Sequence, residues 1–135
     1  MSELAERLCR RYYKDSPHPY RLFEEEVSAV LPTGGALLDA GCGRTAPVLG
    51  KFVNRAGTLL GVDLVDFSGP IQGLTLMAAD LGKLPVQNQS VDVIMSRSVF
   101  EHLQDPQSVY REFHRVLRPR GCVVFLTANM WDYAT

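Results

Sequence analysis

The chain has 135 residues, a length that suits one domain built around one hydrophobic core. Hydrophobic residues make up 46% of it and charged residues 21%, as is ordinary for a soluble globular protein. The net charge of −1 provides no general electrostatic footprint for nucleic acid, so no nucleic-acid partner is expected.

The cysteines and the apolar runs exclude further classes of protein. Cys9, Cys42 and Cys122 are far apart, and neither a CxxC pair nor a Cys/His cluster with zinc spacing occurs. We therefore expect no metal site and a reducing compartment. The first residues lack the apolar centre of a signal peptide, and no apolar run approaches the length of a membrane span. The expected location is cytoplasmic, without stable membrane insertion.

Helical patterns fill the N-terminal part of the chain, residues 1–33. Apolar residues at helical spacing predict one helix over 3–14 and a second over 20–31, separated by the Ser-Pro-His-Pro run at 16–19. Tyr12, Tyr13 and Tyr20 fit two interpretations. They are aromatic walls of a small-molecule pocket or, as we favour, core residues of amphipathic helices.

The pattern changes in the rest of the single expected domain, residues 34–135. Short apolar runs predict five strands, at 36–40, 58–62, 74–79, 91–95 and 122–127. Between them a short helix is expected over 46–54. A longer helix follows the cap Asp105, with arginines in its last turn and Gly121 after it. This alternation predicts an α/β fold, with a doubly wound, Rossmann-like, mostly parallel sheet covered on both faces.

Acidic residues stand at the ends of three predicted strands. Asp39 precedes the glycine turn of Gly41 and Gly43, and Asp63 and Asp80 end the next two strands. Ligands of open α/β sheets bind at this rim. A carboxylate at Asp39 would repel a pyrophosphate but attract an ammonium and a sulfonium. Each Asp alone is equally well explained as a turn residue, and together they favour a cationic adenosyl ligand.

Three stretches resemble a known family. Residues 37–47, LLDAGCGRTAP, resemble the first motif of class I S-adenosylmethionine-dependent methyltransferases, and LLGVDLV at 59–65 resembles the second-strand motif. The stretch from AADLGKLP at 78–85 to FLTAN at 125–129 is similar to the small-molecule group that includes ubiquinone and menaquinone biosynthesis methyltransferases. The resemblance covers about residues 20–130 and implies S-adenosyl-L-methionine as the cofactor. It also implies methyl transfer to a small-molecule or lipid-like acceptor.

The resemblance assigns one group of residues to the methionine end of the cofactor. It implies that this end is held by Asp39, Gly41 and Gly43, with Ser96 and Arg97 near the methionine moiety and the transferring methyl group.

A second group is assigned to the adenosine end. Asp63 would bind the ribose hydroxyls, and Asp80 would hold the adenine together with the backbone of Leu81. The chain departs from the family at Thr45, which replaces the usual third glycine of the first motif.

His102 is the candidate general base for an acceptor that must lose a proton. It lies in Val-Phe-Glu-His-Leu at 99–103, beside Glu101. The alternative is that Glu101 and His102 only shape the loop beneath the cofactor. The two interpretations predict different effects of removing the imidazole.

The family resemblance also implies a seven-stranded sheet with a C-terminal hairpin, whereas this chain ends soon after its fifth predicted strand. We therefore expect a C-terminally truncated domain with an exposed fifth strand, and self-association through that strand. The second functional hypothesis is a non-catalytic S-adenosylmethionine-binding fragment completed by another chain. The third hypothesis is an NAD-dependent oxidoreductase. The G-x-G-x-x-A pattern at 41–46 is compatible with it, but the sequence has no Tyr-x-x-x-Lys catalytic pair.

Overall fold

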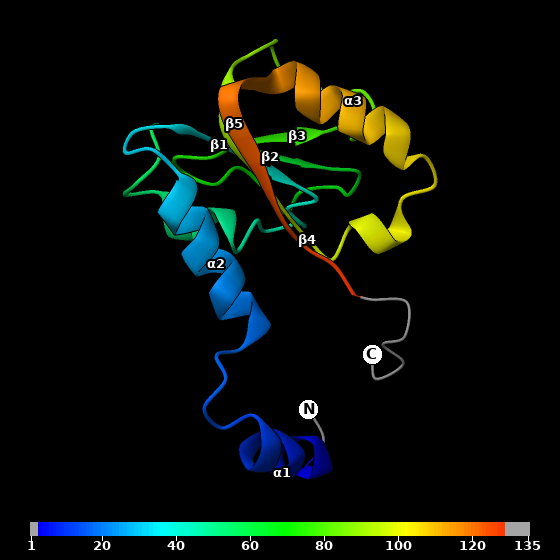
Figure 1. Ribbon diagram of the computed structural model, residues 1–135. Coiled ribbons are helices and arrows are strands. Elements are labelled where there is room, and N and C mark those ends of the chain that lie inside the picture. The colour runs from blue at the N-terminus through cyan, green and yellow to red at the C-terminus, as the bar shows by residue number, and fades with distance from the viewer. Residues whose placement is uncertain (1–2, 129–135) are drawn as a thin grey trace.

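The computed structural model describes residues 3–128, and its centre is one five-stranded sheet. All pairings are parallel, and the strand order is β3-β2-β1-β4-β5. The strands are β1 (Ala36–Ala40), β2 (Thr58–Asp63), β3 (Thr75–Ala78), β4 (Val91–Arg97) and β5 (Leu117–Leu126). The α/β fold with about five parallel strands is therefore confirmed (Figure 1).

The strand order reverses next to β1. The chain moves outward from β1 to β2 and β3, then returns to the other side of β1 for β4 and β5. Leu38 thus pairs with Leu60 on one side and with Ile94 on the other. Such a reversal leaves a crevice outside the carboxyl ends of the two strands, β1 and β4, where open α/β sheets bind ligands.

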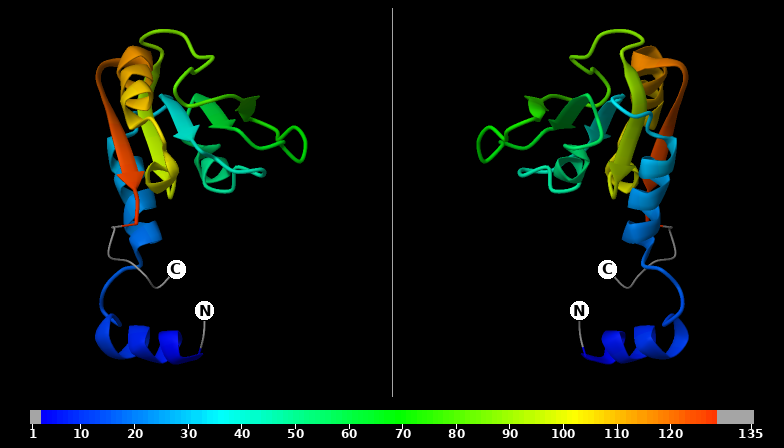
Figure 2. Two further views of the ribbon diagram at one scale, coloured as in Figure 1. Left: turned by 90° about the vertical axis from the view of Figure 1, so that its right-hand side faces the viewer. Right: turned by 90° about the vertical axis from the view of Figure 1, so that its left-hand side faces the viewer.

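Helices cover both faces of the sheet, as expected. On one face, α2 (Pro19–Val30) and the short 3₁₀ helix η1 (Leu49–Phe52) pack around Leu37. On the other, α3 (Pro106–Val116) and the 79–90 segment pack around Leu38. Consecutive residues of β1 point to opposite faces, so Leu37 and Leu38 enter different cores and both are fully buried. Figure 2 gives two side views of the sheet with its helices.

The N-terminal helix α1 (Glu3–Tyr12) stands away from the sheet, below α2 in Figure 1, and buries no residue. Tyr12, Tyr13 and Tyr20 are 65%, 64% and 46% exposed, so their assignment to a core is wrong. Helical spacing predicts that a helix has an apolar face but does not supply a surface to cover it. None of the helices within residues 3–128 is long and apolar enough to cross a membrane.

The helix predicted over 46–54 is also wrong. Only the four residues of η1 are helical there. Ala46 has a φ of 42°, in the left-handed region, so a right-handed helix cannot begin at this residue. Gly50 then lowers helix propensity in the middle of the segment. The glycine turn is consequently not followed directly by the N-terminus of the short α-helix that the sequence suggested.

The helix α3 ends earlier than its arginines indicated. It stops at Val116, and β5 begins at the next residue, so Arg118 lies in a strand and not in a helical turn. Its guanidinium is 2.7 Å from Oδ2 of Asp92, which also accepts from the backbone N–H of Ala36 at 2.8 Å. Through these two contacts, Asp92 at the start of β4 is bonded to both β5 and β1.

Candidate functional site

The glycine turn after β1 forms the centre of the site. Gly41 and Gly43 have φ values of 87° and 75°, which glycine adopts without the penalty of a side chain. A Cβ on Gly41 would overlap the side chain of Val99. The backbone N–H groups of Gly41 and Cys42 donate to the Val62 carbonyl at 2.8 and 3.2 Å, which ties the turn to β2.

Asp63 holds this turn from the end of β2. Its Oδ2 accepts from the backbone N–H of Gly43 at 2.8 Å, and its Oδ1 accepts from that of Val65 at 3.2 Å. A carboxylate oxygen has two lone pairs, so both oxygens retain capacity for ligand hydroxyls. Asp63 therefore holds the glycine turn in place and also lines a cavity beside it, the second of the two described below.

One cavity of about 280 Å³ opens beside the turn and carries charges of both signs. Asp39 is 5% exposed, and burial raises the pKa of its carboxyl to about 7, with Arg97 lowering it and Asp63 raising it by charge. The Arg97 guanidinium lines the same cavity and lies 4.3 Å from the centre of the Tyr20 ring. We call this the first cavity.

The remaining walls of the first cavity are mostly apolar or main chain. They include Phe23 from α2 and the residues that follow the turn: Cys42, Gly43, Arg44, Thr45, Pro47 and Val48. Burial raises the pKa of the Cys42 thiol to about 12, so this sulfur stays neutral at physiological pH and is a poor nucleophile. Asp39, Arg44 and Arg97 are thus the charged side chains among the residues that line this cavity.

A second cavity, of about 630 Å³, lies on the other side of Gly41, which lines both. Its acidic residues are Asp63 and Asp80 from the ends of β2 and β3, with Asp105 from the cap of α3. Oδ1 of Asp80 accepts from the backbone N–H of Gly82 at 2.6 Å, and Leu81 contributes to the wall while reaching the core. The second cavity therefore unites the residues assigned to adenosine.

Ser96 is the predicted site residue that the structure does not bring to either cavity. Its side chain is fully buried, and its hydroxyl donates to the Ala40 carbonyl at 2.8 Å. That bond crosses from β4 to β1, so Ser96 stabilises the ends of the two strands. Its neighbour Arg97 points into the first cavity because successive side chains of a strand alternate in direction.

His102 lies in the short 3₁₀ helix η2 (Phe100–His102) and lines the second cavity together with Asp63 and Asp80. It is not among the residues around the first cavity. Glu101 is engaged elsewhere, because its Oε2 accepts from the Thr127 hydroxyl at 2.6 Å. Burial acts to raise the pKa of Glu101, but this hydrogen bond holds it below its usual range.

Sequence reasoning missed several residues that line these cavities. Ser98 and Val99 belong to the second cavity, and Ser98 has a φ of 56°, a strained value for a residue with a side chain. Phe23 reaches the first cavity from α2, which is distant in sequence. Its apolar periodicity indicated only that it would be buried. Within residues 3–128, no cluster of three or more His, Cys, Asp or Glu residues is placed to hold a metal ion.

Residues 38–125 match the family described as the methyltransferase domain. The chain belongs to this family. A solved S-adenosylmethionine-dependent methyltransferase from Mesorhizobium loti superposes with a TM-score of 0.68 at 28% identity, over 84% of this chain and 54% of that one. The domain's fold and its cofactor, S-adenosylmethionine, agree with the expectations from the sequence.

Two curated relatives of this methyltransferase domain illustrate the range of acceptors. The ubiquinone biosynthesis O-methyltransferase of Albidiferax ferrireducens is 30% identical in an alignment of 125 positions that covers 83% of this chain and 48% of that protein. The arsenite methyltransferase of Aquipseudomonas alcaligenes is 31% identical in an alignment of 118 positions that covers 73% of this chain and 34% of that protein. The chain spans less than half the length of each of the first curated relatives that it matches.

Proposed function

We propose that this domain binds S-adenosylmethionine across the two cavities and transfers its methyl group to a small-molecule or lipid-like acceptor. The observation that carries the proposal is the meeting of the cavities at Gly41. One end of a ligand spanning them faces paired charges of opposite sign, and the other faces carboxylates suited to ribose and adenine. S-adenosylmethionine has this distribution of groups, with a zwitterionic amino acid joined to a nucleoside.

The first cavity suits the amino-acid end. Asp39 is a buried carboxylate that a ligand ammonium would neutralise, and the Arg97 guanidinium supplies donors for the ligand carboxylate. Gly41 and Gly43 allow the main chain to approach the ligand because neither carries a side chain. This donor set supports the assignment of Asp39, Gly41, Gly43 and Arg97 to the methionine moiety.

The second cavity suits the nucleoside. Asp63 offers lone pairs to the ribose hydroxyls, Asp80 offers them to the adenine amino group, and Leu81 lines the same cavity. His102 lines this adenosine side, so its location supports contact with the nucleoside better than proton removal at the methyl group. Its role as a general base remains a prediction.

When bound, S-adenosylmethionine supplies a methyl group on a positively charged sulfur that is a good leaving group. The residues of this chain then mainly bind, orient and exclude water, because an in-line displacement depends on alignment. For the acceptor we propose a chemical class and no individual compound. The relatives are named for ubiquinone biosynthesis, malonyl-acyl-carrier protein, dimethylglycine and arsenite, which share small size or a carrier-bound group.

Calorimetric titration with S-adenosylhomocysteine, with NAD in parallel, tests this proposal. We expect saturable 1:1 binding of S-adenosylhomocysteine and none of NAD, since Asp39 would repel a pyrophosphate held at the glycine turn. Binding of NAD alone would support the oxidoreductase hypothesis instead. Absence of binding by both, in a sample that melts cooperatively, would contradict the proposal.

The second candidate is a cofactor-binding module that another polypeptide completes. It is favoured by β5, the last strand of the sheet, whose outer edge pairs with no strand within residues 3–128. Phe125 on this strand is 52% exposed. Self-association through β5 is the version we propose, because an unpaired strand edge is a template for pairing. Light scattering over a concentration series would reveal a dimer, and Phe125→Lys would be expected to weaken it.

A further inference from the structure

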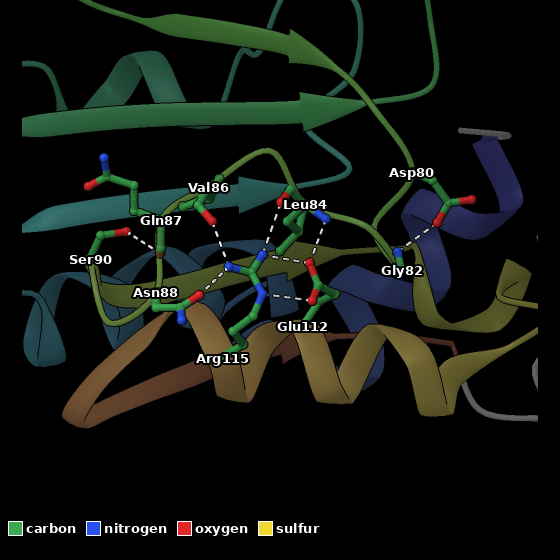
Figure 3. A network of polar contacts seen from close by, with 9 residues as sticks. All are labelled: Asp80, Gly82, Leu84, Val86, Gln87, Asn88, Ser90, Glu112 and Arg115. Atoms are coloured by element: carbon green, nitrogen blue, oxygen red, sulfur yellow. Dashed lines mark hydrogen bonds and ion pairs between the residues drawn. The ribbon is translucent and has the colours of Figure 1, made fainter.

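The 79–90 loop, between β3 and β4, contains no helix or strand, yet it begins with Asp80 and Leu81 at the proposed adenine site. A loop of this kind does not position a hydrogen-bonding carboxylate unless another element holds it. Here that element is α3, from which Glu112 and Arg115 bond to the loop (Figure 3).

Arg115, in the last turn of α3, uses all five of its N–H donors, two toward Glu112 of the same helix and three toward the 79–90 loop. Its guanidinium donates to the two carboxylate oxygens of Glu112 at 2.8 and 2.7 Å. The other three bonds reach the loop: the Val86 carbonyl at 2.8 Å, the Asn88 side-chain oxygen at 2.7 Å and the Leu84 carbonyl at 3.0 Å. A planar fork with fixed geometry makes such a set, whereas a lysine ammonium has three donors at one point.

Glu112 completes the connection at Leu84. Its Oε2 accepts from the backbone N–H of Leu84 at 2.7 Å, so the N–H and the carbonyl of this residue are both bonded to the Glu112–Arg115 pair. Leu84 is also 5% exposed and belongs to the core beneath α3. The pair and the core therefore fix Leu84 in position and orientation, four residues after Asp80.

On the Asp80 side of Leu84 the loop also lies close to α3. A Cβ on Gly82 would lie 3.0 Å from the Ser108 hydroxyl of α3 and 3.0 Å from Oδ1 of Asp80. Ser108 lines the second cavity beside Asp80. One end of α3 thus forms part of the cavity, and its other end holds the loop that brings Asp80 there.

We propose that Glu112 and Arg115 are positioning residues for recognition of the adenine amino group. They act through the 79–90 loop by holding Asp80 and Leu81 at the second cavity, without contacting the ligand. The inference rests on the proposed function, since it concerns the adenine end of that same site. A displacement of the loop would weaken adenine recognition while the first cavity stayed intact.

The test compares S-adenosylhomocysteine with S-inosylhomocysteine, which lacks the amino group that Asp80 would accept from. Wild-type protein should prefer the former by about tenfold, as expected for one hydrogen bond to a charged acceptor. Arg115→Lys should reduce the preference to about twofold. In an Asp80→Ala background the same substitution should change it little, because two residues acting through one contact are not additive. Arg21→Lys is the matched control, since Arg21 pairs with Glu25 at 2.7 Å on an exposed surface of α2.

Thermal melting accompanies each titration. If Arg115→Lys does not fold, Asn88→Ala is the deciding variant, because it removes only one exposed acceptor of the Arg115 guanidinium. It should lower the logarithm of the preference for S-adenosylhomocysteine by about half as much as Arg115→Lys would. A folded Arg115 or Asn88 variant with the wild-type preference would overturn the inference. So would an equal loss of affinity for both ligands that adds to the effect of Asp80→Ala. Wild-type protein that binds neither ligand would instead contradict the proposed function itself.

Discussion

The two cavities on either side of Gly41 are built on different physical principles. In the first, Asp39 is a carboxylate buried at the end of a central strand, and its charge is costly without a partner. In the second, Asp63 and Asp80 end strands nearer the edge of the sheet and are already bonded to backbone N–H groups. The first side therefore favours a ligand that carries a positive charge, whereas the second offers lone pairs in a prepared geometry.

This contrast predicts how each side responds to change. Affinity at the first cavity depends on ionisation and therefore on pH. Affinity at the second depends on the turns that carry its carboxylates. Ligands that fill one side or both separate the two contributions: S-adenosylhomocysteine spans both cavities, and 5′-methylthioadenosine lacks the amino-acid end.

The largest effect is expected at the residue that the two cavities share. Gly41→Ala places a Cβ against Val99 at a φ of 87°, so the turn must shift. Calorimetry should show about a hundredfold loss of affinity for both ligands, because both sides are displaced. Gly50→Ala is the control, since a Cβ there meets nothing within 4 Å. Normal binding by the Gly41 variant would mean that the ligand does not pass over this turn.

Asp39→Asn should affect one side only. It removes the charge that attracts an ammonium while keeping the shape, so affinity for S-adenosylhomocysteine at pH 8 should fall by about thirtyfold. Affinity for 5′-methylthioadenosine should change by less than about twofold, within the scatter expected for an uninvolved site. Asp63→Ala is the matched variant on the other side and should weaken both ligands. Equal losses for both ligands in the Asp39→Asn variant would contradict the division of the site.

A pH series should distinguish the cavities more finely. The pKa of Asp39 is raised to about 7 by burial, and the ionised form is the one that binds an ammonium. Affinity for S-adenosylhomocysteine should therefore increase about tenfold between pH 6 and pH 8 and level off above the pKa. The dependence should vanish in Asp39→Asn and be absent for 5′-methylthioadenosine. A flat profile for the wild-type protein would exclude Asp39 as the partner of the ammonium.

The smallest effect is expected at His102. Because it lines the second cavity near the surface, His102→Ala should weaken 5′-methylthioadenosine by about threefold through lost contact area. Stopped turnover with unchanged affinity, measured once an acceptor is found, would restore the general-base interpretation. His114→Ala, an exposed histidine of α3, serves as the control.

Much of this arrangement could be predicted from the sequence, because parallel strands place their carboxyl ends on one edge. That rule alone brings Asp39, Asp63 and Asp80 together. Residues whose role depends on distant packing could not be predicted. Ser96 and Arg97 are neighbours on β4, and only the face that each side chain occupies decides that Arg97 reaches a cavity and Ser96 does not. The bonds of Arg115 depend on the path of a loop that has no periodic sequence pattern. The prediction of a helix over 46–54 was wrong because nothing in the sequence indicates the left-handed φ of Ala46.

The burial of Asp39 also sets a trade-off between stability and function. Its pKa lies near 7 in the folded chain and near 4 in an unfolded one, so the native state binds the proton more tightly. Folding stability should therefore decline as pH rises from about 4 to 7, by up to about 4 kcal/mol, and stay at the lower level above that range. Asp39→Asn should yield a more stable protein that binds its ligand poorly. Asp39 would therefore lower the stability of the free protein at neutral pH, and its proposed contact with the ligand ammonium would offset that cost when the ligand binds.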